Sequence, residues 1–152
     1  MLRATVSKRE VETYSADETI SLGRKLGATL KAPVLVLLTG DLGTGKTTLT
    51  KGIASGAGAA REQEVTSPTF TLIHKYVGDA KVGRDTSIYH IDLYRVEDRQ
   101  GLESLGLEDI FDESAIVIVE WPERLSLPAK WPVVNIKLEH LSGEVRRIII
   151  DS

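Results

Sequence analysis

Cysteine is absent from this sequence of 152 residues, and aromatic residues make up only 5% of it. Without cysteine the chain has no disulfide framework, no thiolate metal site and no cysteine nucleophile. Long apolar runs are also missing. The longest cover residues 34–38 and 115–119, whereas a membrane-spanning helix needs about twenty residues. The first residues are rich in charge and lack the apolar stretch of a secretory signal. We therefore expect a cytoplasmic protein that does not associate with a membrane.

The composition is that of an ordinary globular domain. Apolar residues make up 41% and charged residues 27%, and the formal net charge is −3. The length fits a single domain over residues 1–152. The mildly acidic balance argues against a large nucleic-acid-binding face, although a local basic patch remains compatible with it.

One segment carries a motif with a clear chemical meaning. Residues 40–47 read GDLGTGKT and match the pattern G-x-x-x-x-G-K-[ST] at every position. The glycines let successive backbone amides point at phosphate oxygens, and the helix expected over Lys46–Gly56 adds positive charge at its N-terminus. Lys46 can reach the β- and γ-phosphates, and the Thr47 hydroxyl can ligate Mg²⁺. The segment is therefore interpreted as a phosphate-binding loop, or P-loop.

A P-loop site also requires an acidic residue at the end of a neighbouring strand, where it holds Mg²⁺ or orients a nucleophile. Asp92 ends the run Ile88–Asp92, and Glu120 ends the apolar run Ala115–Glu120. Either residue can instead be an ordinary acid that caps a loop. Because the same chain carries a P-loop, we favour the functional interpretation for both.

Three hydroxyl residues, Thr66, Ser67 and Thr69, follow Thr47 by about twenty positions. In several NTPases a hydroxyl on a mobile loop at this distance senses the γ-phosphate. The alternative is a simple Ser-Pro turn before a strand. Trp121 directly follows Glu120, where it either packs in the core or shapes the site.

The sequence does not decide which arginine acts at the site, and it gives no histidine a metal-binding role. Five arginines are candidates for neutralising phosphate charge, and the sequence does not choose among Arg95, Arg99, Arg124, Arg146 and Arg147. Three histidines lack metal-ligand spacing and are interpreted as packing or surface residues: His74, His90 and His140.

The remaining pattern predicts an α/β fold with a mixed sheet. A capping box at Ser15 begins a helix over Asp17–Lys31. We expect strands at Val34–Leu38, from Phe70 to Tyr76, and at Ser87–Tyr94, Ala115–Glu120, Val133–Leu138 and Val145–Ile150. Short helical or irregular pieces are expected over Glu97–Phe111, and a turn over Leu141–Glu144.

Three function classes remain open at this point: an ATPase, a small-molecule kinase and a nucleotide-dependent regulator without useful turnover. A GTPase is disfavoured, because the segment Asn135–Leu138 does not supply an N-K-x-D guanine reader. A kinase usually needs a lid bearing arginines, and the segment Glu97–Asp112 has only Arg99.

Four blocks occur in a fixed order: GDLGTGKTTL from Gly40, SPTFTL from Ser67, HIDLYR from His90 and VEWPE from Val119. Together they make the chain resemble the TsaE family, formerly YjeE. These small bacterial P-loop ATPases are needed to make threonylcarbamoyladenosine in tRNAs that read ANN codons. The resemblance covers essentially the whole chain. Thr44 stands where alanine is common in the family, which is a mild change.

The resemblance implies a P-loop three-layer sandwich with a mixed, parallel plus antiparallel, central sheet. It also implies ATP or ADP and Mg²⁺ as cofactors. Catalytic roles fall on Lys46, Asp92 and Glu120, and Mg²⁺ would be ligated by Thr47 and Glu120. The implied nucleotide-binding residues are Asp41, Leu42, Gly43, Thr44, Gly45, Lys46, Thr47, Thr48, Thr66, Ser67 and Trp121.

The resemblance also implies a partner. The expected function is a Mg²⁺-dependent ATPase, weak alone, that binds and resets the TsaD–TsaB heterodimer. On this interpretation tRNA is reached only indirectly, through that complex, and the chain on its own is expected to be a monomer.

Overall fold

The computed structural model describes residues 8–41, 43–68, 71–78, 86–96, 100–101, 105–111, 113–124 and 130–152. Leu42 and Thr69, which the sequence analysis placed near phosphate, lie outside the described residues, as do Phe70 and Arg99. In chain order the main elements are β1 (Lys8–Thr13), α1 (Ala16–Thr29), β2 (Val34–Thr39), α2 (Lys46–Gly56), β3 (Ile73–Val77), β4 (Ser87–Asp92), α4 (Leu107–Phe111), β5 (Ile116–Glu120), β6 (Val133–Ser142) and β7 (Val145–Asp151).

The strands form one seven-stranded sheet in the order β1-β7-β6-β2-β5-β4-β3. The four central strands β6, β2, β5 and β4 are parallel to one another. Strand β3 at one edge and the pair β7 and β1 at the other run antiparallel to their neighbours. The expected mixed sheet is therefore confirmed. Strands β2 and β5 are unbroken apolar runs because both faces of the sheet are covered there.

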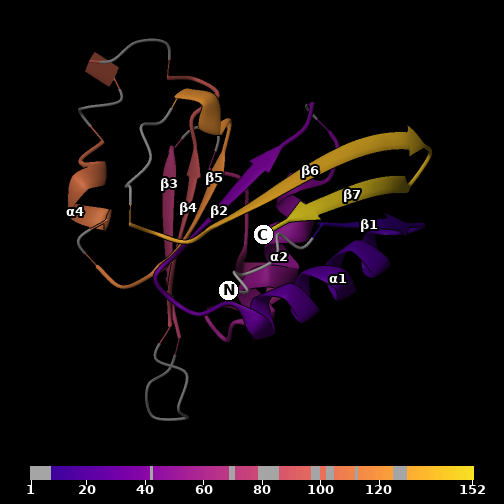
Figure 1. The fold of residues 1–152 in the computed structure, drawn as a ribbon, viewed down its shortest axis with the longest axis horizontal. Helices are drawn as coiled ribbons and strands as arrows, with labels where there is room; N and C mark the ends of the chain where they lie inside the picture. Colours follow the sequence, from indigo (N-terminus) through magenta and orange to yellow (C-terminus); the bar gives the residue numbers. More distant parts are fainter. Residues whose placement is uncertain are drawn as a thin grey trace, which may run out of the picture.

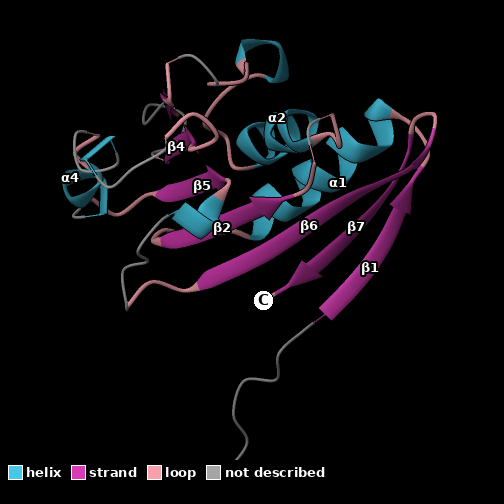
Figure 2. Ribbon diagram, turned by 90° about the horizontal axis from the view of Figure 1, so that it is seen from above, coloured by secondary structure: helices cyan, strands magenta, loops and turns pink. Residues whose placement is uncertain are grey.

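Helices lie on both faces of the sheet, which gives three layers (Figures 1 and 2). Helices α1 and α2 cover one face, where Leu49 and Ile53 pack on Val36 and Leu38. Helix α4 lies on the opposite face over β3, β4 and β5, where a second apolar cluster is buried. Within the described part of the chain, no helix combines the length and the apolarity needed to cross a bilayer.

Helices α1 and α2 approach so closely that glycine is required between them. A Cβ added at Gly52 would lie 2.2 Å from the carbonyl oxygen of Ile20, and one at Gly23 would lie 2.5 Å from that of Leu49. Both distances are far below van der Waals contact, so no larger residue fits without moving a helix backbone. This contact fixes the position of α2, whose first turn belongs to the P-loop.

Several predicted boundaries were wrong. Strand β1 was not predicted, because Lys8–Thr13 shows no apolar run and lies at an edge. The third strand begins only at Ile73, since Leu72 adopts φ +71°, which interrupts extended backbone. Strand β4 ends at Asp92 rather than Tyr94, and β6 continues to Ser142, so the turn is shorter than expected.

Candidate functional site

The P-loop joins the end of β2 to the start of α2, as predicted. Gly40 has φ +149°, and a Cβ there would lie 2.7 Å from the carbonyl oxygen of Leu138. Gly45 is the N-cap of α2 with φ +100°, in the left-handed region. That cap makes no side-chain hydrogen bond, which leaves the first amides of α2 for an anion.

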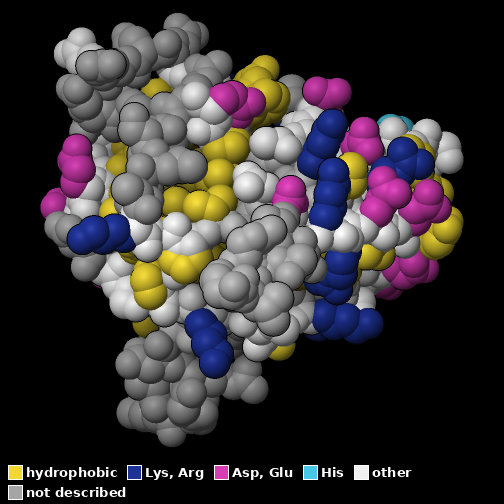
Figure 3. All heavy atoms as spheres, in the orientation of Figure 1, with side chains coloured by type: hydrophobic (Ala, Val, Ile, Leu, Met, Phe, Trp, Pro, Cys, Tyr) yellow, Lys and Arg dark blue, Asp and Glu magenta, His cyan; other side chains and the backbone are white. Residues whose placement is uncertain are grey.

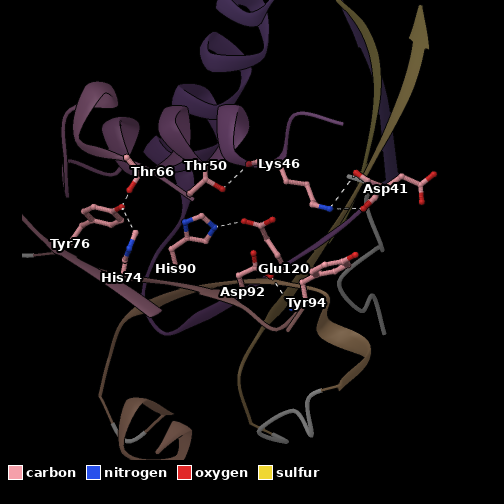
Figure 4. A network of polar contacts seen from close by, with 11 residues as sticks. Asp41, Lys46, Thr50, Thr66, His74, Tyr76, His90, Asp92, Tyr94 and Glu120 are labelled. Carbon is pink, nitrogen blue, oxygen red and sulfur yellow. Dashed lines mark hydrogen bonds and ion pairs between the residues drawn. The ribbon is translucent and has the colours of Figure 1, made fainter. Parts of the chain in front are cut away.

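Lys46 is buried inside the loop, at 6% exposure. Its Nζ atom donates to the carbonyl oxygens of Gly40 at 2.5 Å and Asp41 at 3.4 Å (Figure 4). The same atom lies 4.6 Å from the centroid of the Trp121 ring, a cation–π contact. Trp121 has φ +61°, a costly conformation for a bulky residue, and its ring packs on Tyr94 at 4.9 Å. These contacts hold the ammonium group between the P-loop backbone and the Trp121 ring.

The two predicted carboxylates lie side by side at the carboxyl ends of neighbouring parallel strands. Asp92 of β4 is the register partner of Glu120 of β5. Both are buried, at 3% and 4% exposure. The amide of Tyr94 donates to Oδ1 of Asp92 at 2.9 Å (Figure 4). This edge of the sheet also carries the P-loop, so both acids reach the same pocket.

His90 adds a contact that the sequence analysis missed. Its ring is fully buried, and Nε2 lies 2.6 Å from Oε2 of Glu120 (Figure 4). Among the described residues, Nδ1 of His90 has no hydrogen-bond partner. The interpretation as a packing residue is correct for its burial but incomplete. The signal was the alternation in β4, which places His90 on the same face as Asp92.

A cavity of about 510 Å³ brings most of the predicted residues together. It is lined by Gly43, Gly45, Lys46, Thr47, Thr48, Ser67, Asp92, Tyr94, Glu120, Trp121 and Arg146. The lining therefore combines the P-loop, both strand-end acids, one hydroxyl of the 66–69 segment and one arginine. Tyr94 was not predicted, and Arg146 was only one of five candidates.

Three predicted nucleotide-binding residues lie elsewhere. Asp41 and Thr44 line a neighbouring cavity of about 750 Å³ rather than the one that holds Lys46. The two cavities share Gly43 and Trp121, so they meet at the P-loop. Thr66 lines neither cavity.

The Thr66 amide instead donates to the hydroxyl of Tyr76 at 3.3 Å. That hydroxyl also lies 3.2 Å from Nδ1 of His74, whose Nε2 lies 2.7 Å from the hydroxyl of Thr71. Figure 4 shows Thr66, His74 and Tyr76 together beside the site. The network ties the segment that carries Ser67 to strand β3.

Comparison with known proteins decides the family. The model of the family "Threonylcarbamoyl adenosine biosynthesis protein TsaE" matches residues 13–149. This chain belongs to the TsaE family. The family is involved in tRNA threonylcarbamoyladenosine biosynthesis.

Curated TsaE relatives extend the match. The protein from Haemophilus influenzae is 44% identical over 105 residues, covering 68% of this chain and 62% of that protein. The Bacillus subtilis protein is 41% identical over 136 residues, which cover 90% of this chain and 80% of that protein. The Treponema pallidum protein is 32% identical over 136 residues, which cover 90% of this chain and 95% of that protein. This chain therefore spans less than two thirds of the length of the Haemophilus relative.

A solved structure supports the fold as well. The crystal structure of YdiB from Bacillus subtilis matches with a TM-score of 0.72 and 28% identity. The match covers 99% of this chain and 88% of that one. The α/β sandwich with a mixed sheet is thus shared with a solved relative.

The donor set at the TsaE-family pocket fits a magnesium ion bound together with phosphate. Mg²⁺ prefers oxygen ligands and is usually held by one or two protein groups, with waters and substrate phosphates completing the shell. Thr47 and Glu120 offer a hydroxyl and a carboxylate in one cavity. The bond to His90 occupies only one Glu120 oxygen. Within the described ranges no group of three or more His, Asp and Glu side chains forms a metal cage.

Proposed function

We propose that this chain binds ATP or ADP with Mg²⁺ and hydrolyses ATP. One observation carries the proposal: Lys46 and Thr47 of the P-loop share a single cavity with Asp92 and Glu120. Phosphoryl transfer needs positioned cations for the phosphates and a carboxylate to orient the attacking water. The cavity provides groups of both kinds.

The residues divide the work according to their chemistry. The amides of residues 43–48 and the ammonium group of Lys46 would bind the phosphates. Thr47 and Glu120 would hold Mg²⁺, which when bound would neutralise phosphate charge. Asp92 would orient water. Ser67 would sense the γ-phosphate, so that the segment carrying Ser67 would respond to the bound nucleotide. Trp121 packs on Lys46 and would limit the access of water beside it.

We further propose that the ATP cycle acts on other proteins of tRNA threonylcarbamoyladenosine biosynthesis, namely the TsaD–TsaB heterodimer. Family membership supports this part of the proposal. The formal net charge of −3 argues against a large nucleic-acid-binding face and supports an indirect relation to tRNA. On the face drawn in Figure 3, a column of Lys and Arg side chains lies beside acidic side chains over the β6 and β7 part of the molecule.

The test measures Mg²⁺-dependent phosphate release from ATP, with the chain alone and with a TsaD–TsaB heterodimer. We expect weak release alone and a clear change with the heterodimer. Lys46→Ala should weaken ATP binding by about a hundredfold, because charge-assisted contacts to phosphate are lost. Lys51→Ala is the matched control, since Lys51 lies on the same helix but does not line the cavity.

Three outcomes would contradict the proposal. Phosphate recovered on an added small molecule, with none released free, would indicate a kinase. ATP binding that changes affinity for the heterodimer, without any phosphate release, would indicate a regulator. Unchanged ATP affinity in Lys46→Ala would reject the P-loop assignment itself.

A further inference from the structure

Arg146 connects the last strand of the sheet to the P-loop. Its Nε atom donates to the carbonyl oxygen of Thr44 at 3.0 Å, and Nη2 lies 3.5 Å from that of Gly43. Its Nη1 atom donates to the carbonyl oxygens of Gly143 at 2.8 Å and Val145 at 3.2 Å. The guanidinium group thus bridges the β6–β7 turn and a loop about a hundred residues earlier in the sequence.

The contacts of Arg146 leave its charge without a partner of opposite sign. All four acceptors are neutral backbone carbonyls, and no carboxylate pairs with Arg146 among the described residues. Carbonyls satisfy the N–H donors of a guanidinium group but do not cancel its charge. Because Arg146 also lines the 510 Å³ cavity, its positive charge faces the same space as that of Lys46.

Arg147 provides a contrast on the same strand. Successive side chains of a strand point to opposite faces, so Arg147 lies on the face opposite to the P-loop. There it is within 3.7 to 3.8 Å of three carboxylates, those of Glu10, Glu12 and Glu139. Its charge is therefore balanced locally, and it has no part in the phosphate pocket.

The bond to Thr44 also fixes the direction of one backbone amide. In a trans peptide group the carbonyl and the N–H point in opposite directions. The carbonyl of Thr44 shares its peptide group with the N–H of Gly45, the N-cap of α2. A Cβ at Gly45 would lie 3.7 Å from Nε of Arg146, so the guanidinium group packs directly against this glycine. With the carbonyl held by Arg146, the Gly45 amide must point away from it.

We propose that Arg146 is a positioning residue of the nucleotide site. It holds the Thr44–Gly45 peptide group so that the Gly45 amide faces a bound polyphosphate, and its own charge adds to that of Lys46. This inference rests on the proposed nucleotide binding. It selects Arg146 among the five candidate arginines. Arg146 would act by positioning the P-loop backbone and would not contact the reacting atoms.

The first experiment compares MgATP dissociation constants by titration calorimetry for three variants. Arg146→Gln should raise the constant by about ten- to a hundredfold, because one charge and the bridge between the turn and the loop are lost. Arg146→Lys keeps the charge but not the fork of donors, so it should recover only part of the affinity. Arg147→Gln removes the same charge from the next residue and should stay within about twofold of the wild type. An Arg146→Gln value equal to that of Arg147→Gln would overturn the inference.

The second experiment needs no nucleotide. The backbone order parameter of the Gly45 amide, measured by ¹⁵N relaxation in the nucleotide-free protein, should fall in Arg146→Gln from about 0.85 towards about 0.6. It should not fall in Arg147→Gln. An unchanged value in Arg146→Gln would overturn the positioning role. If the wild type failed to bind MgATP while the order parameter still fell, the proposed function would be rejected and the positioning of this peptide group would stand.

Discussion

The buried contact between His90 and Glu120 makes a quantitative prediction about stability. His90 has no exposed surface and the Glu120 side chain is 5% exposed, with 2.6 Å between Nε2 and Oε2. His90→Phe would leave the Glu120 carboxylate buried without this partner. Removing one member of a buried pair typically costs about 3–5 kcal/mol. Phenylalanine replaces the imidazole by a slightly larger ring, so no cavity is left.

The unpartnered Nδ1 atom of His90 reduces the expected loss. Among the described residues this buried atom has no hydrogen bond, and an unsatisfied buried group costs about 1–3 kcal/mol. His90→Phe removes that penalty together with the favourable contact. We therefore expect a net destabilisation of about 2 kcal/mol, which for a domain of this size lowers the melting temperature by about 4–8 °C.

Urea unfolding of a double-mutant cycle gives the test. The double variant His90→Phe, Glu120→Leu replaces both partners by apolar groups and should recover most of the loss. The two single variants should therefore be non-additive by at least about 1 kcal/mol. If the double variant instead loses the sum of the two single losses, the pair is not an energetic unit and the reasoning is refuted.

Three further predictions concern the scaffold. Gly52→Ala should lower the free energy of unfolding by about 2 kcal/mol or more, because its Cβ would lie 2.2 Å from a backbone carbonyl oxygen of α1. Urea unfolding measures this loss, and Ser55→Ala, on the same helix, is the control. Tyr76→Phe should speed hydrogen exchange of the Thr66 amide, which donates to the lost hydroxyl, while global stability changes by about 1 kcal/mol at most. Burial and the hydrogen bond to Glu113 raise the pKa of Tyr89 above 10.0. The stability that the protonated Tyr89 hydroxyl contributes is therefore complete below pH 10 and is lost as the pH rises further. As the pH is raised, Tyr89→Phe should lose less of its free energy of unfolding than the wild type does, measured by unfolding at alkaline pH.

The part of the site that was predictable is local in the sequence. The P-loop is a contiguous motif, and Asp92 and Glu120 each end an apolar strand. Parallel strands bring their carboxyl ends to one edge of a sheet, so a strand-end acid can be placed before its neighbours are known. These residues do share one cavity.

The part that was missed depends on pairing between distant strands. Arg146 reaches the loop only because β7 pairs antiparallel with β6, and β6 pairs parallel with β2. The β6–β7 pairing was predictable from the short turn between the two strands and is confirmed, but the sequence of β7 has no signal for the pairing of β6 with β2. His90 contacts Glu120 because β4 lies beside β5 in a particular register. The alternation in β4 places His90 on the face of Asp92 but does not identify β5 as the neighbouring strand.

The strand order also separates the basic and acidic residues of the cavity on either side of β2. Strands β6 and β7 lie on one side and bring Arg146 to the loop, while β5 and β4 lie on the other and bring Glu120 and Asp92. If the cation side binds phosphate and the acid side binds Mg²⁺, variants on the two sides should differ in their response to the metal. Arg146→Gln should weaken ADP binding by the same factor with and without Mg²⁺, because it acts on the loop and the phosphates. Glu120→Gln should weaken ADP binding mainly when Mg²⁺ is present. Titration calorimetry of both variants, with the metal and with a chelator, measures the two ratios. Equal metal dependence in the two variants would show that the division by strand order does not extend to function.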